Sequence, residues 1–315
     1  SNPGRIARAV LPLVRRLHAE RPFDLVDAQF FFPDGPAAAI VARELGLPLT
    51  IKSRGADIHY WGGRPAALQQ IQEAARQAAG MLAVSKALRR DMVALGMPEA
   101  RIGIHYTGLD RERFRPAERK AARARVSAMP DLGIRPDGAL IVSPGSLIPR
   151  KGQALAIEAL ARLSGAHLAL AGAGEDEKRL RALATSLGVA DRVQFLGFVG
   201  HNLLPLVLSA ADVLVLPSAS EGLANVWVEG LACGTPIVVP DIGGAREVVK
   251  DDSAGRVVLR TPEAIADAVR AILADPPSQE AVCAHAARFS WTANAGNLAR
   301  FWSDVLSGNP IGPRA

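Results

Sequence analysis

The chain has 315 residues, 49 % hydrophobic and 22 % charged, which excludes a disordered protein and is long enough for two domains. Its formal charge is +6, but aromatic residues make up only 5 % and do not alternate with basic ones, so nucleic-acid binding is not expected. No apolar run approaches the roughly 20 residues of a membrane-spanning helix. Two cysteines provide no disulfide or metal framework and fit a reducing cytoplasm.

The first third of the chain alternates between short apolar runs and amphipathic segments. The pattern predicts helices at 5–18, 36–45, 66–79 and 86–95, and strands at 24–28, 49–52, 81–84 and 102–106. A polar loop, 53–59, follows the second strand. Regular alternation of this kind is typical of a parallel, doubly wound sheet.

An arginine-rich stretch from Asp110 to Arg125 follows. We interpret it as a linker plus an exposed helix whose charge run is a solvated face, with a phosphate- or membrane-binding role as the alternative. A second series then predicts strands at 140–143, 167–171, 193–196, 213–216, 237–239 and 257–258, and helices at 154–163, 175–187, 203–209, 226–233, 262–273, 279–288 and 293–306. The chain is therefore expected to form two domains, residues 1–115 and 116–289, with a last helix within 290–315.

The most informative stretch runs from Leu214 to Pro240 and is expected to form strand, loop, helix and strand. Asn225 is predicted to cap the helix and Gly234 to end it. Glu221 in the loop and Glu229 on the otherwise apolar helix are costly to bury unless something hydrogen-bonds them. Because ligands of open α/β sheets bind beyond the carboxyl ends of the strands, we expect both carboxylates to face one polar ligand.

A second loop, Gly145 to Gly152, follows a buried strand and opens a helix. Such a loop is an anion cradle, and Arg150 and Lys151 add cations where a diphosphate would lie. The alternative to an anion-binding role is that Arg150 and Lys151 are simply surface residues at the start of a helix. The turn at Gly172–Gly174 is interpreted as tight packing rather than a phosphate site.

Three residues remain ambiguous in the sequence. Gly230 lies inside the predicted helix, where either close packing or drift would explain it. His105 ends a strand and His59 lies in the polar loop, and for both a structural role is favoured over catalysis.

With these residues considered, the chain resembles the retaining glycosyltransferases of family 4, which have the GT-B fold of two Rossmann-like domains facing a cleft. The most specific part is EGLANVWVEGLACGTP at 221–236, which looks like the family's two glutamates with seven residues between them, followed by a glycine and a proline. The supporting segments are Arg150–Gly152, Phe195–Phe198, Ala211–Ser218, Gly243–Glu247 and Gly108–Phe114. The resemblance covers nearly the whole chain.

The resemblance implies that the second domain binds a nucleotide-diphosphate sugar. Glu229 would hold the ribose hydroxyls and Glu221 those of the donor sugar. Arg150 and Lys151 would neutralise the leaving diphosphate, so that these two and Glu221 carry the catalysis without a metal or cofactor. The remaining donor-binding residues implied are Gly145 and Ser146, then Phe198 and Val199, which would flank the base, and the backbone N–H groups of Gly222, Leu223, Ala224, Asn225 and Val226.

The chain departs from the family pattern in three places. Ser146 stands where many relatives have arginine. Arg54 stands where many have a histidine, so Arg54 and Asp57 are the acceptor-side candidates and a histidine-based mechanism is not expected. The family's opening strand and glycine-rich loop have no counterpart, which implies an incomplete first sheet, an open acceptor side and poor turnover. The terminal helix, 290–315, would cross back onto the first domain.

The resulting hypothesis is a glycosyltransferase that moves a sugar from a nucleotide donor to a saccharide or lipid-linked acceptor with retention of configuration. Its expected setting is bacterial cell-surface polysaccharide assembly, in the cytoplasm or peripherally at the inner membrane face, with no nucleic-acid partner. The alternatives are a non-catalytic sugar-nucleotide-binding protein and a sugar-nucleotide epimerase on the same fold.

Overall fold

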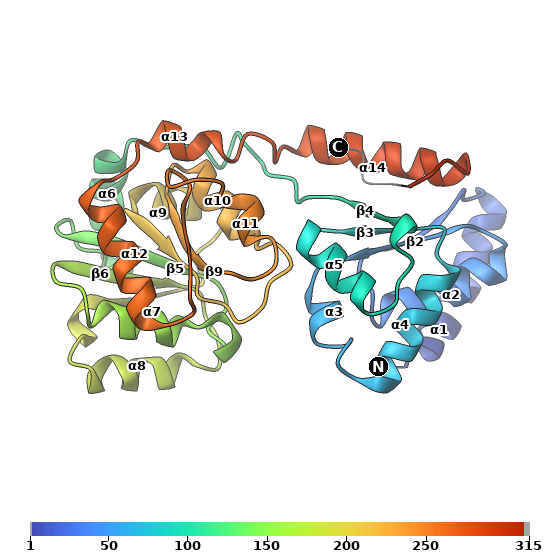
Figure 1. Ribbon diagram of the computed structural model, residues 1–315, viewed down its shortest axis with the longest axis horizontal. Coiled ribbons are helices and arrows are strands. Elements are labelled where there is room, and N and C mark those ends of the chain that lie inside the picture. The colour runs from blue at the N-terminus through green and yellow to red at the C-terminus, as the bar shows by residue number, and fades with distance from the viewer. Residues whose placement is uncertain (1, 312–315) are drawn as a thin grey trace. The chain divides into compact units, whose positions relative to one another are not determined.

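The computed structural model describes residues 2–311, which form two compact α/β units. The first unit comprises the described residues up to Gly108 and those from Thr292 onward, and the second runs from Leu109 to Trp291. Each contains one parallel sheet (Figure 1). No helix among residues 2–311 is both long and apolar enough to span a bilayer.

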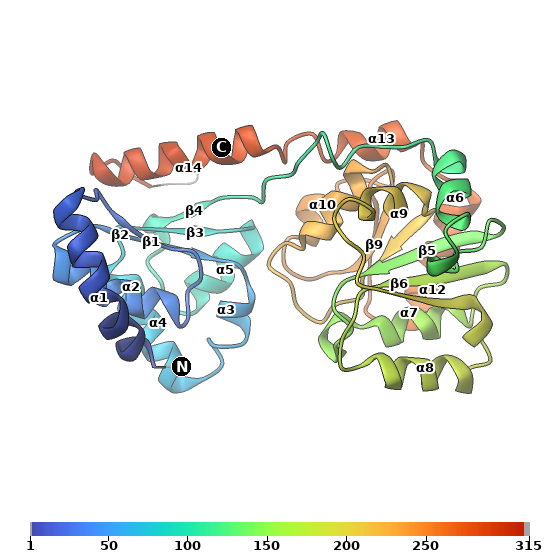
Figure 2. The same ribbon diagram turned by 180° about the vertical axis from the view of Figure 1, so that it is seen from behind.

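The sheet of the first unit has the strand order β1-β2-β3-β4, with all neighbours parallel. The strands are β1 (Val26–Ala28), β2 (Leu49–Ser53), β3 (Gly80–Ala83) and β4 (Ile102–Ile104). The helices are α1 (Pro3–Glu20), α2 (Asp34–Leu45), α3 (Ala56–His59), α4 (Pro65–Gln77), α5 (Lys86–Ala94) and α14 (Trp291–Leu306), with a 3-10 turn η1 (Glu99–Arg101). Figures 1 and 2 show α14 on one side of this sheet and α2 and α4 on the other.

The sheet of the second unit has the order β10-β9-β8-β5-β6-β7. Its strands are β5 (Ala139–Pro144), β6 (Ala166–Ala171), β7 (Val193–Gly197), β8 (Val213–Val215), β9 (Ile237–Pro240) and β10 (Gly255–Val258). Because β5 pairs with β6 on one side and β8 on the other, the winding direction reverses between β5 and β8. In open α/β sheets ligands bind at this switch point, beyond the carboxyl ends of the strands.

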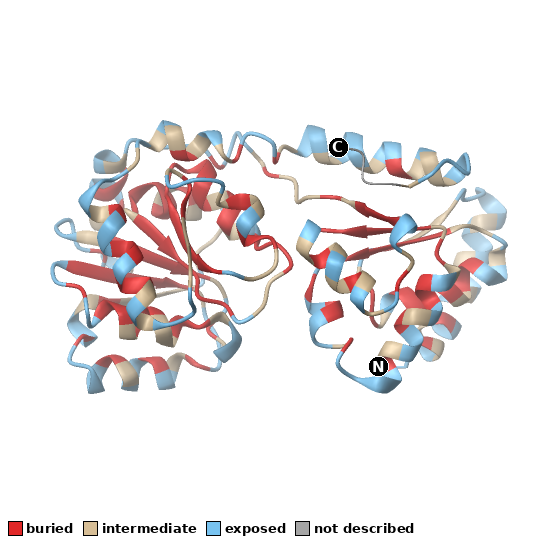
Figure 3. Ribbon diagram, viewed as in Figure 1, coloured by how far each residue is buried: buried red, intermediate tan, exposed pale blue. Residues whose placement is uncertain are grey.

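Eight helices are described around the second sheet. They are α6 (Arg119–Ser127), α7 (Gln153–Leu160), α8 (Glu177–Ser186), α9 (Leu204–Ala210), α10 (Asn225–Ala232), α11 (Ala245–Val248), α12 (Pro262–Ala274) and α13 (Gln279–Ala284), with 3-10 turns η2 (Pro130–Leu132), η3 (Pro149–Lys151) and η4 (Ala190–Arg192). Helices α7 and α12 bury apolar side chains against one face of the sheet, while α9 and α10 lie on the other (Figures 1 and 2). Figure 3 shows the strands as an almost continuous buried layer, which explains why they are uniformly apolar in sequence.

The structure departs from the sequence-based expectations at several local points. The polar loop after β2 contains the short helix α3, and α11 was not predicted. Helix α10 begins at Asn225 itself, with Ala224 as the N-cap residue and no side-chain capping hydrogen bond, so the prediction that Asn225 caps it is wrong. Residues 109–115, expected in the first domain, lie in the second unit, where the Phe114 ring contacts His201.

The arginine-rich helix α6 is not simply a solvated face. Arg123 is buried and donates to the carbonyl oxygen of Ala210 and to Asp212 Oδ2 at 2.8 Å. Arg119 donates to the carbonyl oxygen of Gly234 at 2.9 Å. These two arginines therefore attach the helix to the unit, and only part of the charge run remains on the surface.

Candidate functional site

Two loops meet at the switch point of the second sheet, one after β5 and one after β8. The amide of Ala219 donates to the carbonyl oxygen of Arg150 at 2.8 Å, and the Arg150 guanidinium donates to the carbonyl oxygen of Ser220 at 2.6 Å. A Cβ on Gly152 would lie 2.1 Å from the carbonyl oxygen of Pro217, so only glycine allows this approach. The sequence separates the two loops by about 70 residues, and the parallel sheet brings them together.

An ion pair links the two loops. Lys151 Nζ lies 2.6 Å from Glu221 Oε1, and the side chains are 17 % and 12 % exposed. Arg150 Nη1 lies 3.6 Å from the same oxygen. The predicted catalytic cations and the predicted sugar-binding carboxylate are thus together, and the Glu221 carboxylate offsets one of the two positive charges.

Glycine turns hold both loops in place. A Cβ on Gly243 would lie 2.1 Å from the carbonyl oxygen of Glu221. The amide of Gly244 donates to the carbonyl oxygen of Gly222 at 2.8 Å. A Cβ on Gly172 would lie 1.9 Å from the carbonyl oxygen of Gly145, which confirms that the Gly172–Gly174 turn serves close packing. Substituting any of these glycines would displace the loop that carries the site.

The backbone N–H groups differ between the two loops. The N–H groups of Gly145 and Leu147 donate to the carbonyl oxygens of residues 171 and 173, so most of the expected anion cradle is already hydrogen-bonded, and only the amide of Ser146 between them has no acceptor among residues 2–311. By contrast, none of the N–H groups from Gly222 to Val226 donates a hydrogen bond to any described residue. The backbone N–H groups at the start of α10 and in the loop before it therefore lack an acceptor within the described chain, and the donor-binding role of Gly222, Leu223, Ala224, Asn225 and Val226 stays a prediction.

Glu229 lies one turn into α10, and its carboxyl group makes no hydrogen bond or ion pair with any residue of the described chain. Burial raises its pKa from 4.5 to about 7. A carboxylate with no partner in an apolar helix costs free energy of folding, because desolvation is not offset. Gly230, beside it, is explained by close packing, since a Cβ there would lie 2.8 Å from Leu214 Cδ1 of the segment that forms β8.

Phe198 and Val199 follow β7 at the same edge of the sheet. Gly197 has φ +63, and the Phe198 side chain beyond it is 84 % exposed. A large apolar ring left in water is available for stacking on a planar ligand.

In the first unit, the two acceptor-side candidates have different surroundings. Asp57 is fully buried, and its oxygens accept hydrogen bonds from the amides of Phe31, Arg54 and Gly55 and from Ser53 Oγ, at 2.8–3.3 Å. This carboxylate organises the loop, so the expectation that it faces an acceptor is wrong. Arg54 is exposed and donates through Nε to the carbonyl oxygen of Gln29.

A buried polar pair in the first unit was missed by sequence reasoning. Lys52 Nζ lies 2.8 Å from His105 Nδ1, and His105 Nε2 donates to the carbonyl oxygen of Asn294 in α14. Burial and the charge of Arg54 lower the pKa of Lys52 to about 8. Burial and the Lys52 charge also lower the pKa of His105, which keeps its ring neutral and Nδ1 an acceptor. His105 therefore has the structural role that was favoured, tying α14 to the sheet.

Comparison with known families places the chain. Residues 126–289 match the family described as glycosyl transferases group 1, and residues 1–113 match glycosyltransferase family 4. The chain belongs to the group 1 glycosyl transferases. The resemblance found in the two-glutamate stretch is thereby confirmed.

Two of the curated relatives have names that refer to inositol-containing molecules. The chain is 32 % identical over 307 residues to the GDP-mannose-dependent alpha-(1-6)-phosphatidylinositol monomannoside mannosyltransferase of Mycobacterium tuberculosis, covering 91 % of this chain and 78 % of that protein. It is 36 % identical to the D-inositol 3-phosphate glycosyltransferase of Mycobacteroides abscessus over 63 % of this chain, which spans 45 % of that relative's length.

Solved structures confirm the expected fold. The Anabaena protein HepE, crystallised with UDP, matches with a TM-score of 0.83 at 22 % identity, over 94 % of this chain and 82 % of that one. Sucrose-phosphate synthase from Thermosynechococcus elongatus matches with a TM-score of 0.80 at 21 % identity, over 95 % and 78 %. The glycosyltransferase therefore has the α/β architecture of GT-B enzymes.

Proposed function

We propose that the second unit binds a nucleotide-diphosphate sugar at the switch point between β5 and β8, and that the enzyme transfers the sugar to an acceptor with retention of configuration. The observation that carries the donor site is Glu229, a half-buried carboxyl group that has no partner among the described residues, close in sequence to five backbone N–H groups that likewise have none. Ribose hydroxyls are the missing donors for Glu229. Phosphate oxygens are the missing acceptors for the amides.

The ion pair suggests how the donor engages the site. A diphosphate carries more negative charge than one carboxylate and competes with Glu221 for Lys151. Once Lys151 and Arg150 face the diphosphate, Glu221 is free to accept hydrogen bonds from the donor sugar. As the glycosyl–phosphate bond breaks, the cations stabilise the leaving diphosphate and the carboxylate stabilises positive charge on the sugar. In this scheme protein cations do the work of a metal at the leaving group.

The acceptor is proposed to be a saccharide or lipid-linked molecule, and the inositol-containing acceptors in the relatives' names are the first to try. A lipid-linked acceptor would place the enzyme peripherally at the inner membrane face. Assembly of bacterial cell-surface glycans is the proposed setting.

Calorimetry with GDP and UDP tests the donor site. At least one is expected to bind saturably, with binding lost in Glu229→Ala and weakened in Lys151→Ala. Glu280→Ala, which removes an exposed acid of α13, is the matched control and should bind as the wild type does. Failure of the wild type to bind any nucleoside diphosphate would contradict the proposal. Incubation with donor and acceptor together should release the free nucleoside diphosphate, which distinguishes sugar transfer from non-catalytic donor binding. An isomerised donor without acceptor would indicate an epimerase.

A further inference from the structure

Arg260, in the segment after β10, reaches the point where the two loops of the proposed donor site cross. Its Nε donates to the carbonyl oxygen of Pro217, in the loop after β8, at 2.8 Å. Its Nη2 lies 3.2 Å from the position that a Cβ on Gly152, in the loop after β5, would occupy. One guanidinium group from a third segment therefore donates to one loop and lies beside the other.

The crossing is next in sequence to one of the predicted catalytic cations. Gly152 directly follows Lys151, and its φ of +77 is a conformation that glycine adopts readily and other residues rarely do. Because Gly152 has no side chain to pack, the close approach of the two backbones depends on hydrogen bonds made nearby. The amide of Ala219 supplies one of these bonds, to the carbonyl oxygen of Arg150 at 2.8 Å.

The other links between the two loops are made by side chains that the donor would engage. Lys151 Nζ lies 2.6 Å from Glu221 Oε1, and Arg150 Nη1 donates to the carbonyl oxygen of Ser220 at 2.6 Å. When both cations turn to a diphosphate, these links weaken. The backbone hydrogen bond and Arg260 then hold the crossing, and Arg260 has no acidic partner among residues 2–311 that competes for it.

We propose that Arg260 is a positioning residue for sugar transfer, which keeps the loops after β5 and β8 together when the donor draws Lys151 away from Glu221. The inference rests on the proposed donor site. Lys151 stabilises the leaving diphosphate only from within hydrogen-bond reach, so a loop displaced by about 1 Å loses much of this stabilisation. Arg260 acts through the backbone that carries Lys151.

Hydrogen exchange of the Ala219 amide, followed by NMR without any ligand, tests whether Arg260 holds the crossing. Arg260 is exposed, so Arg260→Met should leave the core intact, while the amide exchanges about tenfold faster because the loops separate more often. Arg135→Met is the control, since it breaks another arginine–carbonyl hydrogen bond of the same unit, to Asp191. Wild-type exchange in Arg260→Met would overturn the inference whether or not a donor binds.

A double-mutant cycle tests whether Arg260 acts through Lys151. By calorimetry, Arg260→Met should bind GDP or UDP about tenfold more weakly than the wild type, but should cost nothing further in the Lys151→Ala background. Arg260→Lys, which can still donate to one carbonyl oxygen, should recover part of the affinity. Equal losses in the two backgrounds would mean that Arg260 does not act through Lys151, and would overturn the inference.

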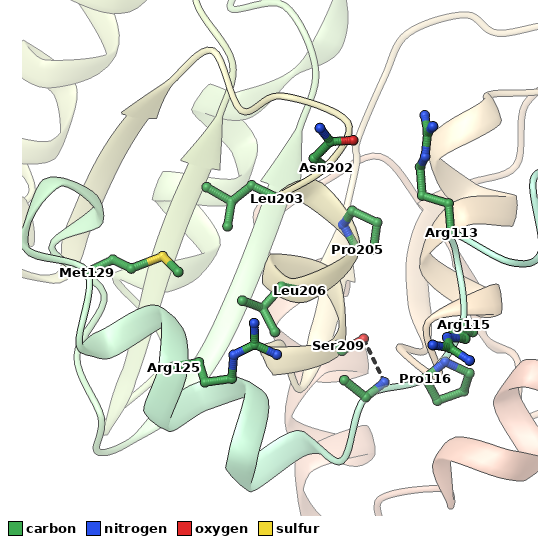
Figure 4. A pocket seen from close by; sticks show the side chains of 11 residues that line it. Arg113, Arg115, Pro116, Arg125, Met129, Asn202, Leu203, Pro205, Leu206 and Ser209 are labelled. Carbon is green, nitrogen blue, oxygen red and sulfur yellow. Dashed lines mark hydrogen bonds between the residues drawn. The ribbon is translucent and has the colours of Figure 1, made fainter.

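A charge control separates positioning from the loss of one positive charge. Arg125 lies on α6 beside an open hollow that shares no lining residue with either loop (Figure 4). It makes no hydrogen bond or ion pair with the described residues, so Arg125→Met removes a charge alone and should bind as the wild type does. Equal weakening in Arg125→Met and Arg260→Met would assign the effect to net charge and overturn the inference. A wild type that binds no nucleoside diphosphate would instead contradict the proposed function, and the exchange of Ala219 would still decide whether Arg260 holds the loops together.

Discussion

Asp57 in the first unit and Glu229 in the second each lie near the carboxyl end of a strand, Asp57 fully buried and Glu229 half-buried, and the surroundings of the two carboxyl groups are opposite. Asp57, after β2, accepts hydrogen bonds from three amides and a hydroxyl. Glu229, on the helix after β8, accepts none from the described residues, and burial raises its pKa to about 7. The carboxylate of Asp57 is satisfied by its own loop and by the amide of Phe31, and that of Glu229 is held without a partner among the described residues, at a cost in stability.

The difference teaches how to separate structural acids from ligand-binding ones. A satisfied carboxylate is needed by the fold and has no free lone pair to offer, whereas an unsatisfied one has its full capacity available to a ligand. Asp57 lies in a polar loop and Glu229 on an otherwise apolar helix, but neither local sequence shows which carboxylate finds hydrogen-bond donors in the folded chain.

The largest effect is expected from Asp57→Ala. Removing the carboxylate leaves the amides of Phe31, Arg54 and Gly55 without an acceptor, which should lower the free energy of unfolding by about 3 kcal/mol. Urea denaturation followed by tryptophan fluorescence measures this. Nucleoside diphosphate binding, located in the other unit, should persist. Glu73→Ala, which removes an exposed acid of α4, is the control. Equal stability of the two variants would contradict the structural role of Asp57.

A smaller effect is expected from Glu229→Gln, seen in the pH dependence of binding. Ribose hydroxyls donate to the ionised carboxylate, so wild-type affinity for GDP or UDP should rise about tenfold between pH 6 and pH 8, as Glu229 loses its proton near pH 7. The ligand's own phosphate ionisation contributes in both proteins, and the glutamine variant isolates it. An identical pH profile for the two proteins would show that Glu229 does not contact the ligand.

The same substitution should change stability in the opposite direction to Asp57→Ala. Because the folded-state pKa of Glu229 is raised, its contribution is fully present below about pH 4.5 and is lost as pH rises through about 7. Above pH 7, Glu229→Gln should therefore unfold at higher urea concentration than the wild type. Destabilisation at pH 8 would contradict the absence of a partner for Glu229.

The smallest effect is expected from Glu221→Gln, which breaks the pair with Lys151. Without the competing carboxylate, Lys151 is free for phosphate, and affinity for a nucleoside diphosphate should rise about threefold while sugar transfer falls. Asp267→Asn, which neutralises an exposed acid paired with Arg270, is the matched control for calorimetry. Weaker diphosphate binding in Glu221→Gln would mean that Glu221 positions Lys151 rather than competing for it.

Much of the donor site was predictable because its elements have local patterns. The strand–loop–helix–strand order around Glu221 and Glu229 follows from apolar runs and turn residues, and the cations Arg150 and Lys151 follow from a glycine-flanked loop. Their meeting follows from the rule for parallel sheets, since both loops leave neighbouring strands at the same edge. The roles assigned to these residues in donor binding stay predictions that the variants above test.

Sequence alone determined the alternation of strands and helices, the two series of βα units and the family, because periodicity, turn residues and motif spacing are properties of neighbouring residues. Tertiary structure decided which charged groups are free. Asp57 receives a hydrogen bond from Phe31, and Lys151 pairs with Glu221 across about 70 residues. Arg123 is held by Ala210 and Asp212. The hydrogen-bond partners of a buried charge come from whichever segments the packed sheet brings beside it, and no local pattern specifies them.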